Sequence, residues 1–155
     1  MGSYVAVVGP SAADEADLAD AEAVGRGLAE RGHVVLCGGH GGVMEAVACG
    51  AAQAGGIVVG LLPGTDRSAA NPHVTVAIPT GLGEMRNALL VRSSDVVVSI
   101  GGSWGTLSEV ALAVRTGVPV VALRGWSLPG DPGLHPVSTV DEALRLIDAL
   151  GPHDG

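Results

Sequence analysis

Short apolar runs alternate along the chain with longer segments in which polar and apolar positions are mixed. The runs with the length and β-branched content of buried strands are residues 4–8, 34–37, 57–62, 74–78, 95–100 and 118–123. The mixed segments with the length of helices are residues 14–31, 43–54, 82–94, 106–116 and 140–150. The pattern therefore predicts six strands that alternate with five helices.

This alternation predicts the fold class. A strand that returns through a helix to the next parallel strand makes a right-handed crossover, and apolar strands without polar gaps are typical of sheets covered on both faces. We therefore predict an α/β, Rossmann-like, doubly wound and mainly parallel sheet of about six to seven strands, with helices on both faces. We expect one domain over residues 1–155, with proline- and glycine-bearing loops at residues 63–72 and 125–136.

The composition limits the classes of partner that the protein can bind and its cellular location. Hydrophobic residues make up 47% of the 155 residues and charged residues 15%, which excludes a disordered chain. The formal net charge of -8 disfavours nucleic acid and anionic membranes as partners. No apolar run reaches about 18 residues, so we expect no membrane span and a cytoplasmic location. Cys37 and Cys49 lack the spacing of a zinc site or a disulfide framework, and we expect no metal site.

Glycine-rich turns follow three of the predicted strands at the carboxyl edge of the sheet. Ligands bind there in open α/β sheets, because the N–H groups of helix N-termini attract anions. Tight strand-to-helix turns are the alternative explanation, but two dense turns in one sheet favour a shared site for a phosphorylated, nucleotide-like ligand. The turn residues that we expect to contact such a ligand are Gly9, Ser11, Gly38, Gly39, His40, Gly41, Gly42, Gly101, Gly102, Ser103, Trp104, Gly105 and Thr106.

Two charged residues near these turns are candidates for chemistry. Glu109 follows Thr106 by three residues, so it is either a functional carboxylate or the acidic end of a capping box. Arg86 falls near the start of a predicted helix, where a cation is unfavourable. It is either exposed, paired with Glu84 or Glu109, or a clamp on a ligand phosphate.

Two side chains within the turns are each open to two interpretations. His40 either contacts the ligand or is a solvated loop histidine. Trp104 either stacks on a base or closes its turn. Neither glycine run is a P-loop, since no Gly-Lys-Ser/Thr follows, and neither matches GxGxxG.

Three stretches resemble the LOG-like family, whose members were historically mislabelled lysine decarboxylases. They are Cys37-Gly-Gly-His-Gly-Gly-Val-Met-Glu45, Gly83-Glu-Met-Arg-Asn87 and Ile100-Gly-Gly-Ser-Trp-Gly-Thr-Leu-Ser-Glu109. The last is similar to the family signature PGGxGTxxE, with Gly101 in place of the proline and Ser103 in place of a glycine. Within this superfamily the chain most resembles the small proteins related to molybdenum cofactor carrier protein, and more distantly DNA-processing protein A.

The resemblance implies an activity and the residues that carry it. LOG enzymes are phosphoribohydrolases that cleave the N-glycosidic bond of a nucleoside 5'-monophosphate and release the base and ribose 5-phosphate. Arg86 and Glu109 match the catalytic arginine and glutamate of the family, and Asn87 joins the ligand-binding set. No cofactor would be required for hydrolysis, the ligand would be AMP-like, and a homodimer or higher homo-oligomer is expected. The alternative is a non-catalytic carrier that binds molybdenum cofactor or another phosphorylated nucleotide-like ligand through the same turns.

Overall fold

Seven parallel strands form one sheet. The structure, a computed structural model, describes residues 2–152. The order of the strands across the sheet is β4-β3-β2-β1-β5-β6-β7, and every neighbouring pair is parallel. In chain order the strands are β1 (Tyr4–Val8), β2 (Val34–Cys37), β3 (Val58–Leu62), β4 (Val76–Pro79), β5 (Val96–Ile100), β6 (Val120–Leu123) and β7 (Leu134–Val137). The predicted parallel α/β sheet is confirmed.

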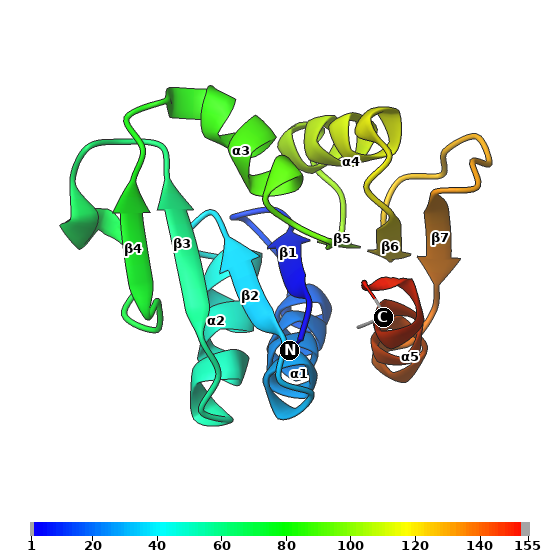
Figure 1. Cartoon of the computed structure of the whole chain (residues 1–155), viewed down its shortest axis with the longest axis horizontal. Coiled ribbons are helices and arrows are strands. Elements are labelled where there is room, and N and C mark those ends of the chain that lie inside the picture. The colour runs from blue at the N-terminus through cyan, green and yellow to red at the C-terminus, as the bar shows by residue number, and fades with distance from the viewer. Residues whose placement is uncertain (1, 153–155) are drawn as a thin grey trace.

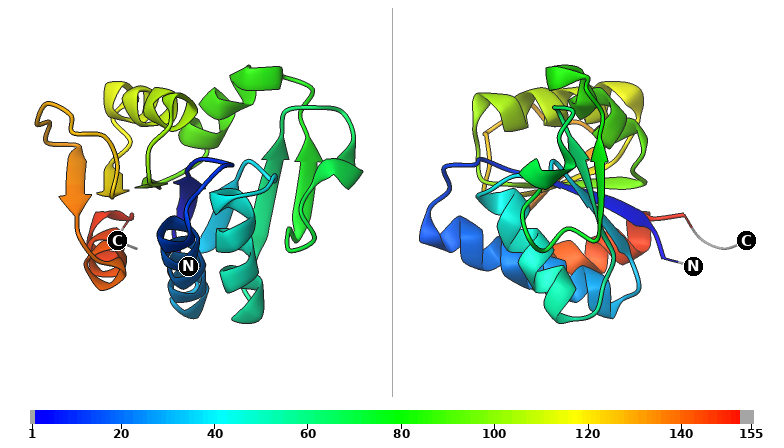
Figure 2. Two further views of the ribbon diagram at one scale, coloured as in Figure 1. Left: turned by 180° about the vertical axis from the view of Figure 1, so that it is seen from behind. Right: turned by 90° about the vertical axis from the view of Figure 1, so that its left-hand side faces the viewer.

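Helices cover both faces of this sheet, as predicted. They are α1 (Glu15–Glu30), α2 (Val43–Gln53), α3 (Arg86–Arg92), α4 (Trp104–Thr116) and α5 (Val140–Leu150), with short 3-10 turns η1 (Arg67–Ala69) and η2 (Gly83–Met85). Helices α1, α2 and α5 lie on one side and α3 and α4 on the other (Figures 1 and 2). Each layer has its own cluster of buried Val, Leu, Ile and Ala side chains.

The strand order creates a switch point beside β1. From β1 the chain moves outward through β2 and β3 to β4, and it then returns to β5 on the other side of β1 (Figure 1). The connections that leave β1 and β5 therefore diverge to opposite faces of the sheet. A crevice at the carboxyl ends of these two strands is where this topology places a ligand.

The seventh strand was missed by the sequence pattern. Residues 134–137 begin within the predicted loop at residues 125–136 and end one residue after it, yet they pair with β6. Their sequence, Leu-His-Pro-Val, is no continuous apolar run, and proline lacks an N–H for a ladder. The strand forms because β7 is an edge, where Pro136 needs to pair on one side only.

Helix α4 begins two residues earlier than predicted, and this changes the interpretation of Glu109. Ser103 is the N-cap, and its Oγ accepts a hydrogen bond from the Thr106 N–H at 3.1 Å. Thr106 lies inside the helix, so the capping-box interpretation of Thr106 and Glu109 is wrong. The same spacing does cap α5, where Thr139 Oγ1 accepts from the Glu142 N–H and Glu142 Oε2 accepts from the Ser138 N–H.

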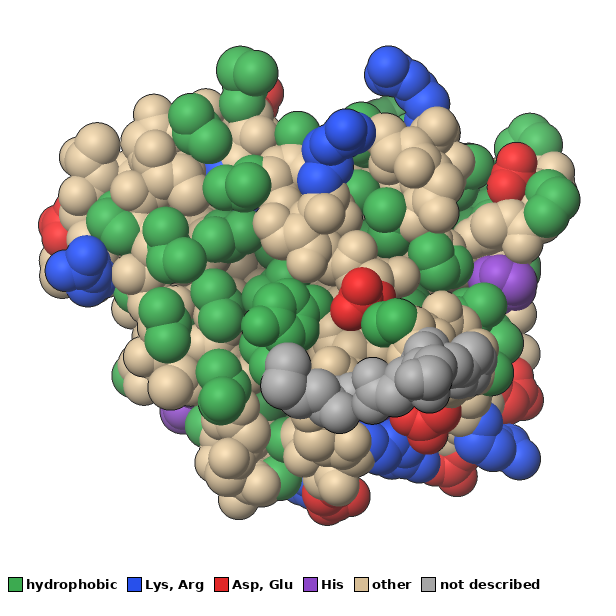
Figure 3. All heavy atoms as spheres, in the orientation of Figure 1, with side chains coloured by type: hydrophobic (Ala, Val, Ile, Leu, Met, Phe, Trp, Pro, Cys, Tyr) green, Lys and Arg blue, Asp and Glu red, His purple; other side chains and the backbone are tan. Residues whose placement is uncertain are grey.

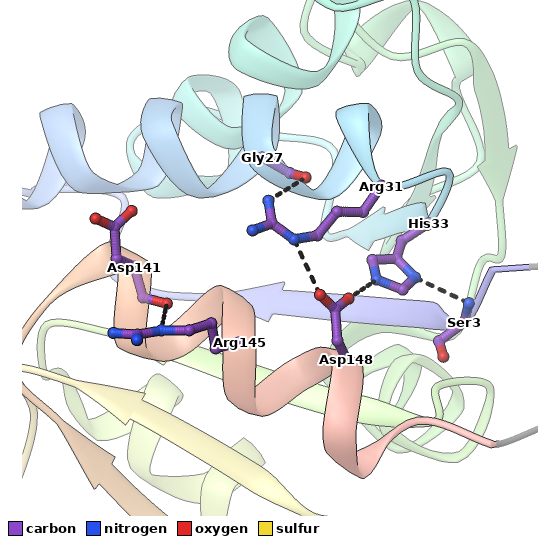
Figure 4. A network of polar contacts seen from close by, with 7 residues as sticks. All are labelled: Ser3, Gly27, Arg31, His33, Asp141, Arg145 and Asp148. Carbon is purple, nitrogen blue, oxygen red and sulfur yellow. Dashed lines mark hydrogen bonds and ion pairs between the residues drawn. The ribbon is translucent and has the colours of Figure 1, made fainter.

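A polar network joins α5 to the opposite end of the sheet from the crevice (Figure 4). The Ser3 N–H donates to His33 Nδ1 at 3.0 Å, so the proton of the neutral ring is on Nε2, which lies 2.9 Å from Asp148 Oδ1. Asp148 also accepts from Arg31 Nε at 3.0 Å. The His33 side chain is 8% exposed, so its ring lies buried beside the Asp148 carboxylate, which is 47% exposed.

Replacing His33 with alanine is expected to lower the free energy of unfolding by about 1–3 kcal/mol, because the buried Ser3 N–H would lose its acceptor. Urea denaturation measures the change. Arg145 is the control. Within residues 2–152 its Nε bonds only to a carbonyl oxygen of its own helix, so its replacement by alanine should cost less than about 0.5 kcal/mol. Equal losses in the two variants would contradict the role of the network.

Candidate functional site

A cleft of about 210 Å³ opens at the switch point. Its wall combines the turn after β1, the turn after β2, the start of α3 and the first two turns of α4. The predicted site residues that line it are Gly9, Ser11, Gly38, Arg86, Asn87, Ser103, Gly105, Thr106 and Glu109. Residues distant in sequence thus meet in one cavity, including both residues proposed for chemistry.

The two glycine runs converge from either side of β1. The strands that precede them, β2 and β5, both pair with β1, so β1 lies between the two runs. Gly38 of the first run lines the same cleft as Ser103 and Gly105 of the second. Residues of both turns therefore line one cavity.

The other predicted turn residues do not line this cleft, and their contact with a ligand stays a prediction. They are Gly39, His40, Gly41, Gly42, Gly101, Gly102 and Trp104.

Two of these glycines are required by the conformation of the backbone. Gly42 has φ +68°, and a Cβ there would lie 2.5 Å from the Pro10 carbonyl oxygen. Gly101 has φ +69° and a Cβ would lie 2.7 Å from an Asp17 carboxylate oxygen, so both positions exclude a side chain.

Arg86 starts α3 and sends its guanidinium across the turn after β2. A Cβ at Gly38 would collide with Arg86 Nη1, so the absence of a side chain at Gly38 gives the guanidinium its place. The Nε of Arg86 is buried and has no hydrogen-bond partner among residues 2–152. In the same range, no ion pair joins Arg86 to Glu84 or Glu109, so the predicted salt bridges do not form. A buried N–H group without an acceptor is costly in free energy.

Glu109 lies in the second turn of α4 and is half-buried in the cleft wall. Burial raises its pKa from 4.5 to about 7, against the opposing effect of the positive charge on Arg86. Protonated and ionised forms are therefore both populated near neutral pH. A carboxyl group with such a pKa, in a cleft beside a cation, is typical of functional sites.

The N-terminus of α4 completes the site. Ser103 Oγ satisfies the Thr106 N–H and lies 2.9 Å from Thr106 Oγ1. The preceding N–H group in the first turn belongs to Gly105, which lines the cleft. An α-helix of 13 residues places partial positive charge here. The arrangement can hold an oxyanion between the start of α4 and the guanidinium of Arg86.

Further residues in and around the cleft were not among the predicted site residues. Met44 and Leu90 form apolar parts of the wall, and Pro10 contributes to the β1 turn. Trp126, in the loop after β6, donates its Nε1–H to the Ser103 carbonyl oxygen at 3.1 Å. This contact depends on the tertiary structure alone, because 23 residues separate its partners.

The substitution Gly38→Ala tests the placement of Arg86. The new methyl group would meet Arg86 Nη1 and Met44 Sδ, which are the ends of flexible side chains, so the fold should survive with a loss below about 1 kcal/mol. Displacing the guanidinium should weaken phosphate binding roughly tenfold or more. Calorimetric titration with inorganic phosphate measures this. Gly64→Ala is the matched control, because a Cβ there has open space; unchanged phosphate affinity in Gly38→Ala would contradict the placement.

Residues 2–152 offer neither a metal-ligand cluster nor a membrane-spanning helix. That range holds no cluster of three or more His, Cys, Asp or Glu side chains suited to a metal ion. None of the helices built from it has both the length and the apolar character needed to cross a membrane.

The fold and the cleft define a Rossmann-like α/β protein whose binding cavity lies at a topological switch point. The family model of the SLOG cluster4 family matches residues 2–145, and the chain belongs to this family. This confirms the superfamily that the sequence motifs indicated. The narrower assignment to LOG enzymes stays a prediction.

Known proteins show the same fold and related sequences. An uncharacterized protein of Archaeoglobus fulgidus is 42% identical over 120 residues, which cover 77% of this chain and 79% of that protein. The molybdenum cofactor binding protein of Rippkaea orientalis has a TM-score of 0.89 and 35% identity, covering 96% of this chain and 97% of that one. The molybdenum cofactor carrier protein of Chlamydomonas reinhardtii has a TM-score of 0.85 and 31% identity, covering 97% and 98%.

A more distant likeness concerns the fold alone. DNA processing protein A of Helicobacter pylori, which binds single-stranded DNA, has a TM-score of 0.75 but 19% identity, covering 97% of this chain and 82% of that one. The likeness to DNA-processing protein A is therefore one of fold.

Proposed function

We propose that this protein is a carrier that binds a small phosphorylated ligand, molybdenum cofactor in the first place, and holds its phosphate in the cleft at the switch point. The observation that carries the proposal is the buried Nε of Arg86, which has no acceptor among the described residues. A ligand oxyanion supplies that acceptor. The same oxyanion accepts from the N–H groups at the start of α4.

The dimensions of the cleft fit the phosphate end of such a ligand. Pockets that enclose whole small ligands measure about 300–1,000 Å³. The cleft measures about 210 Å³, so it accommodates a phosphate and the atoms next to it. The remainder of the ligand then extends beyond the cleft. A small ligand also agrees better than nucleic acid with the net charge of -8.

The relatives support a carrier more than an enzyme. The proteins of Rippkaea orientalis and Chlamydomonas reinhardtii are described as a molybdenum cofactor binding protein and a molybdenum cofactor carrier protein. Both match this chain over nearly their full lengths. Transfer of this property to the present chain would assign Arg86, Gly38, Ser103 and Gly105 to the terminal phosphate of the cofactor.

Co-purification tests the carrier function. The protein is expressed in a host that makes molybdenum cofactor, purified without oxygen and denatured with an oxidant, and the fluorescent oxidised pterin is measured per mole of protein. A substantial fraction of one equivalent is expected. Arg86→Met, purified in parallel, should carry much less. Absence of pterin from the wild-type protein, with no uptake of added cofactor, would reject the carrier function.

A second candidate is a phosphoribohydrolase, and the carboxyl group of Glu109 is the observation that favours it. With a pKa of about 7, Glu109 can accept or donate a proton near neutral pH. As a carboxylate it would stabilise positive charge that develops on the ribose, while Arg86 holds the phosphate. Incubation with a panel of nucleoside monophosphates, followed by chromatography, tests this. Free base would support hydrolysis, and its absence for every monophosphate would remove the candidate.

A further inference from the structure

An aromatic pair lies beside the cleft at the N-terminus of α4. The ring centroids of Trp104 and Trp126 are 4.9 Å apart, and the ring planes are inclined by 40°. The hydrogen bond from Trp126 Nε1 to the Ser103 carbonyl oxygen ties the pair to the N-cap residue of α4. Trp104 is nevertheless 78% exposed. Exposure of so large an apolar ring next to a polar cleft indicates a surface that contacts something else.

A groove of about 730 Å³ between α3 and α4 adjoins the cleft. Trp104 lines it together with Met85, which is 73% exposed, and hydrophobic side chains also gather over α3 on the face drawn in Figure 3. Asn87 and Gly105 line both the groove and the cleft, so the two cavities share a wall. Trp126 does not line the groove. Trp104 therefore has an aromatic neighbour away from the groove and open space within it.

We propose that this groove holds a flat heteroaromatic ring, stacked on Trp104, of the same ligand whose phosphate binds in the cleft. The inference rests on the proposed function and specifies the ligand class: a phosphate ester that carries a purine, a pterin or a similar ring. Trp104 is then a specificity-determining residue that selects such ligands over plain sugar phosphates. Aromatic side chains bind flat rings in this way because stacking uses the face of the ring and does not depend on the pattern of hydrogen-bonding groups at its edge.

The chemistry of the groove favours a heteroaromatic ring over a purely apolar group. Glu84 and Arg115 line the groove as well, and they provide an acceptor and donors for the polar edge of a ring. The cavity on the other side of the cleft, which shares Ser11 with it, is less suitable. That cavity is lined by Glu15, Glu22 and Glu45, whose charges repel an anionic ligand.

The two tryptophans of the pair are the only ones in the chain, so intrinsic fluorescence reports directly on the platform. AMP and ribose 5-phosphate are titrated against the wild-type protein, with calorimetry for affinity and chromatography to check for released base. We expect AMP to bind roughly tenfold or more tightly than ribose 5-phosphate and to quench tryptophan emission, while ribose 5-phosphate leaves the emission almost unchanged.

Variants show which tryptophan ring is responsible for the tighter binding of AMP. In Trp104→Leu the affinity for AMP should fall to that for ribose 5-phosphate, whose own affinity should stay within about twofold. Leu89→Ala is the control, because Leu89 is an exposed residue of α3 that does not line the groove. In Trp126→Leu, quenching by AMP should persist, since the emission then comes from Trp104 alone.

The results that would contradict the stacking platform differ from those that would contradict the proposed function. Equal affinities of AMP and ribose 5-phosphate for the wild-type protein, without quenching, would overturn the platform and leave the phosphate site intact. Failure of inorganic phosphate and of both esters to bind would reject the proposed function together with the platform. A dimer that forms without ligand and dissociates in Trp104→Leu, seen by sedimentation velocity, would assign the groove to a second copy of the chain and overturn the proposal.

Discussion

Arg86→Met is expected to weaken binding of phosphate esters by roughly 10- to 100-fold and to leave the fold intact. The guanidinium is the cation placed at the cleft, and its buried Nε lacks an acceptor within residues 2–152. Hydrogen bonds between charged partners contribute about 1.5–3 kcal/mol each, which corresponds to the expected loss of affinity. Methionine retains much of the length and the packing of the side chain without the charge.

The same substitution should not destabilise the ligand-free protein. Removing a buried donor that has no partner relieves a cost, so the free energy of unfolding should stay constant or rise by about 1 kcal/mol. Calorimetry with inorganic phosphate and ribose 5-phosphate gives the affinities, and urea denaturation gives the stability. The matched control is Arg92→Met, at the exposed end of the same helix. A lower stability without loss of phosphate affinity would show that Arg86 is a structural residue.

Glu109→Gln is expected to remove a pH dependence of stability that the wild-type protein shows. The folded state holds the pKa of Glu109 near 7, above its ordinary value of 4.5, so between these pH values the folded state binds more protons than the unfolded state. The free energy of unfolding therefore falls as pH rises through this window. Each pKa unit corresponds to about 1.4 kcal/mol, so the full difference amounts to roughly 3 kcal/mol.

The measurement compares urea denaturation of the wild-type and variant proteins at pH 5 and pH 8. At pH 8 the glutamine variant should be more stable than the wild type by a few kcal/mol, and at pH 5 the two should be closer. Glu30→Gln, at the exposed end of α1, is the matched control and should follow the wild type. A constant difference between wild type and Glu109→Gln across this range would mean that the carboxyl group titrates normally.

The cleft at the switch point contains both features that the sequence predicted and features that it did not. The glycine runs after buried strands predicted both turns, and the family motifs indicated Arg86 and Glu109. In the structure Arg86 and Glu109 line the cleft together with turn residues Gly38, Ser103 and Gly105. The spacing of Thr106 and Glu109 allowed a capping box that the structure does not contain. Ser103 and Thr106 can each start a helix, and in the structure Ser103 does so.

The α/β class, the alternation of strands and helices and the turns that end beside the cleft could all be predicted from the sequence. These features follow from local preferences: β-branched runs, helical segments and glycines at positions of positive φ. Contacts between distant parts of the chain set the pairing of β7, the contact of Trp126 with Ser103, the lack of an acceptor for Arg86 Nε among residues 2–152 and the raised pKa of Glu109. Each of these depends on burial and on neighbours far away in the chain, which no local pattern encodes.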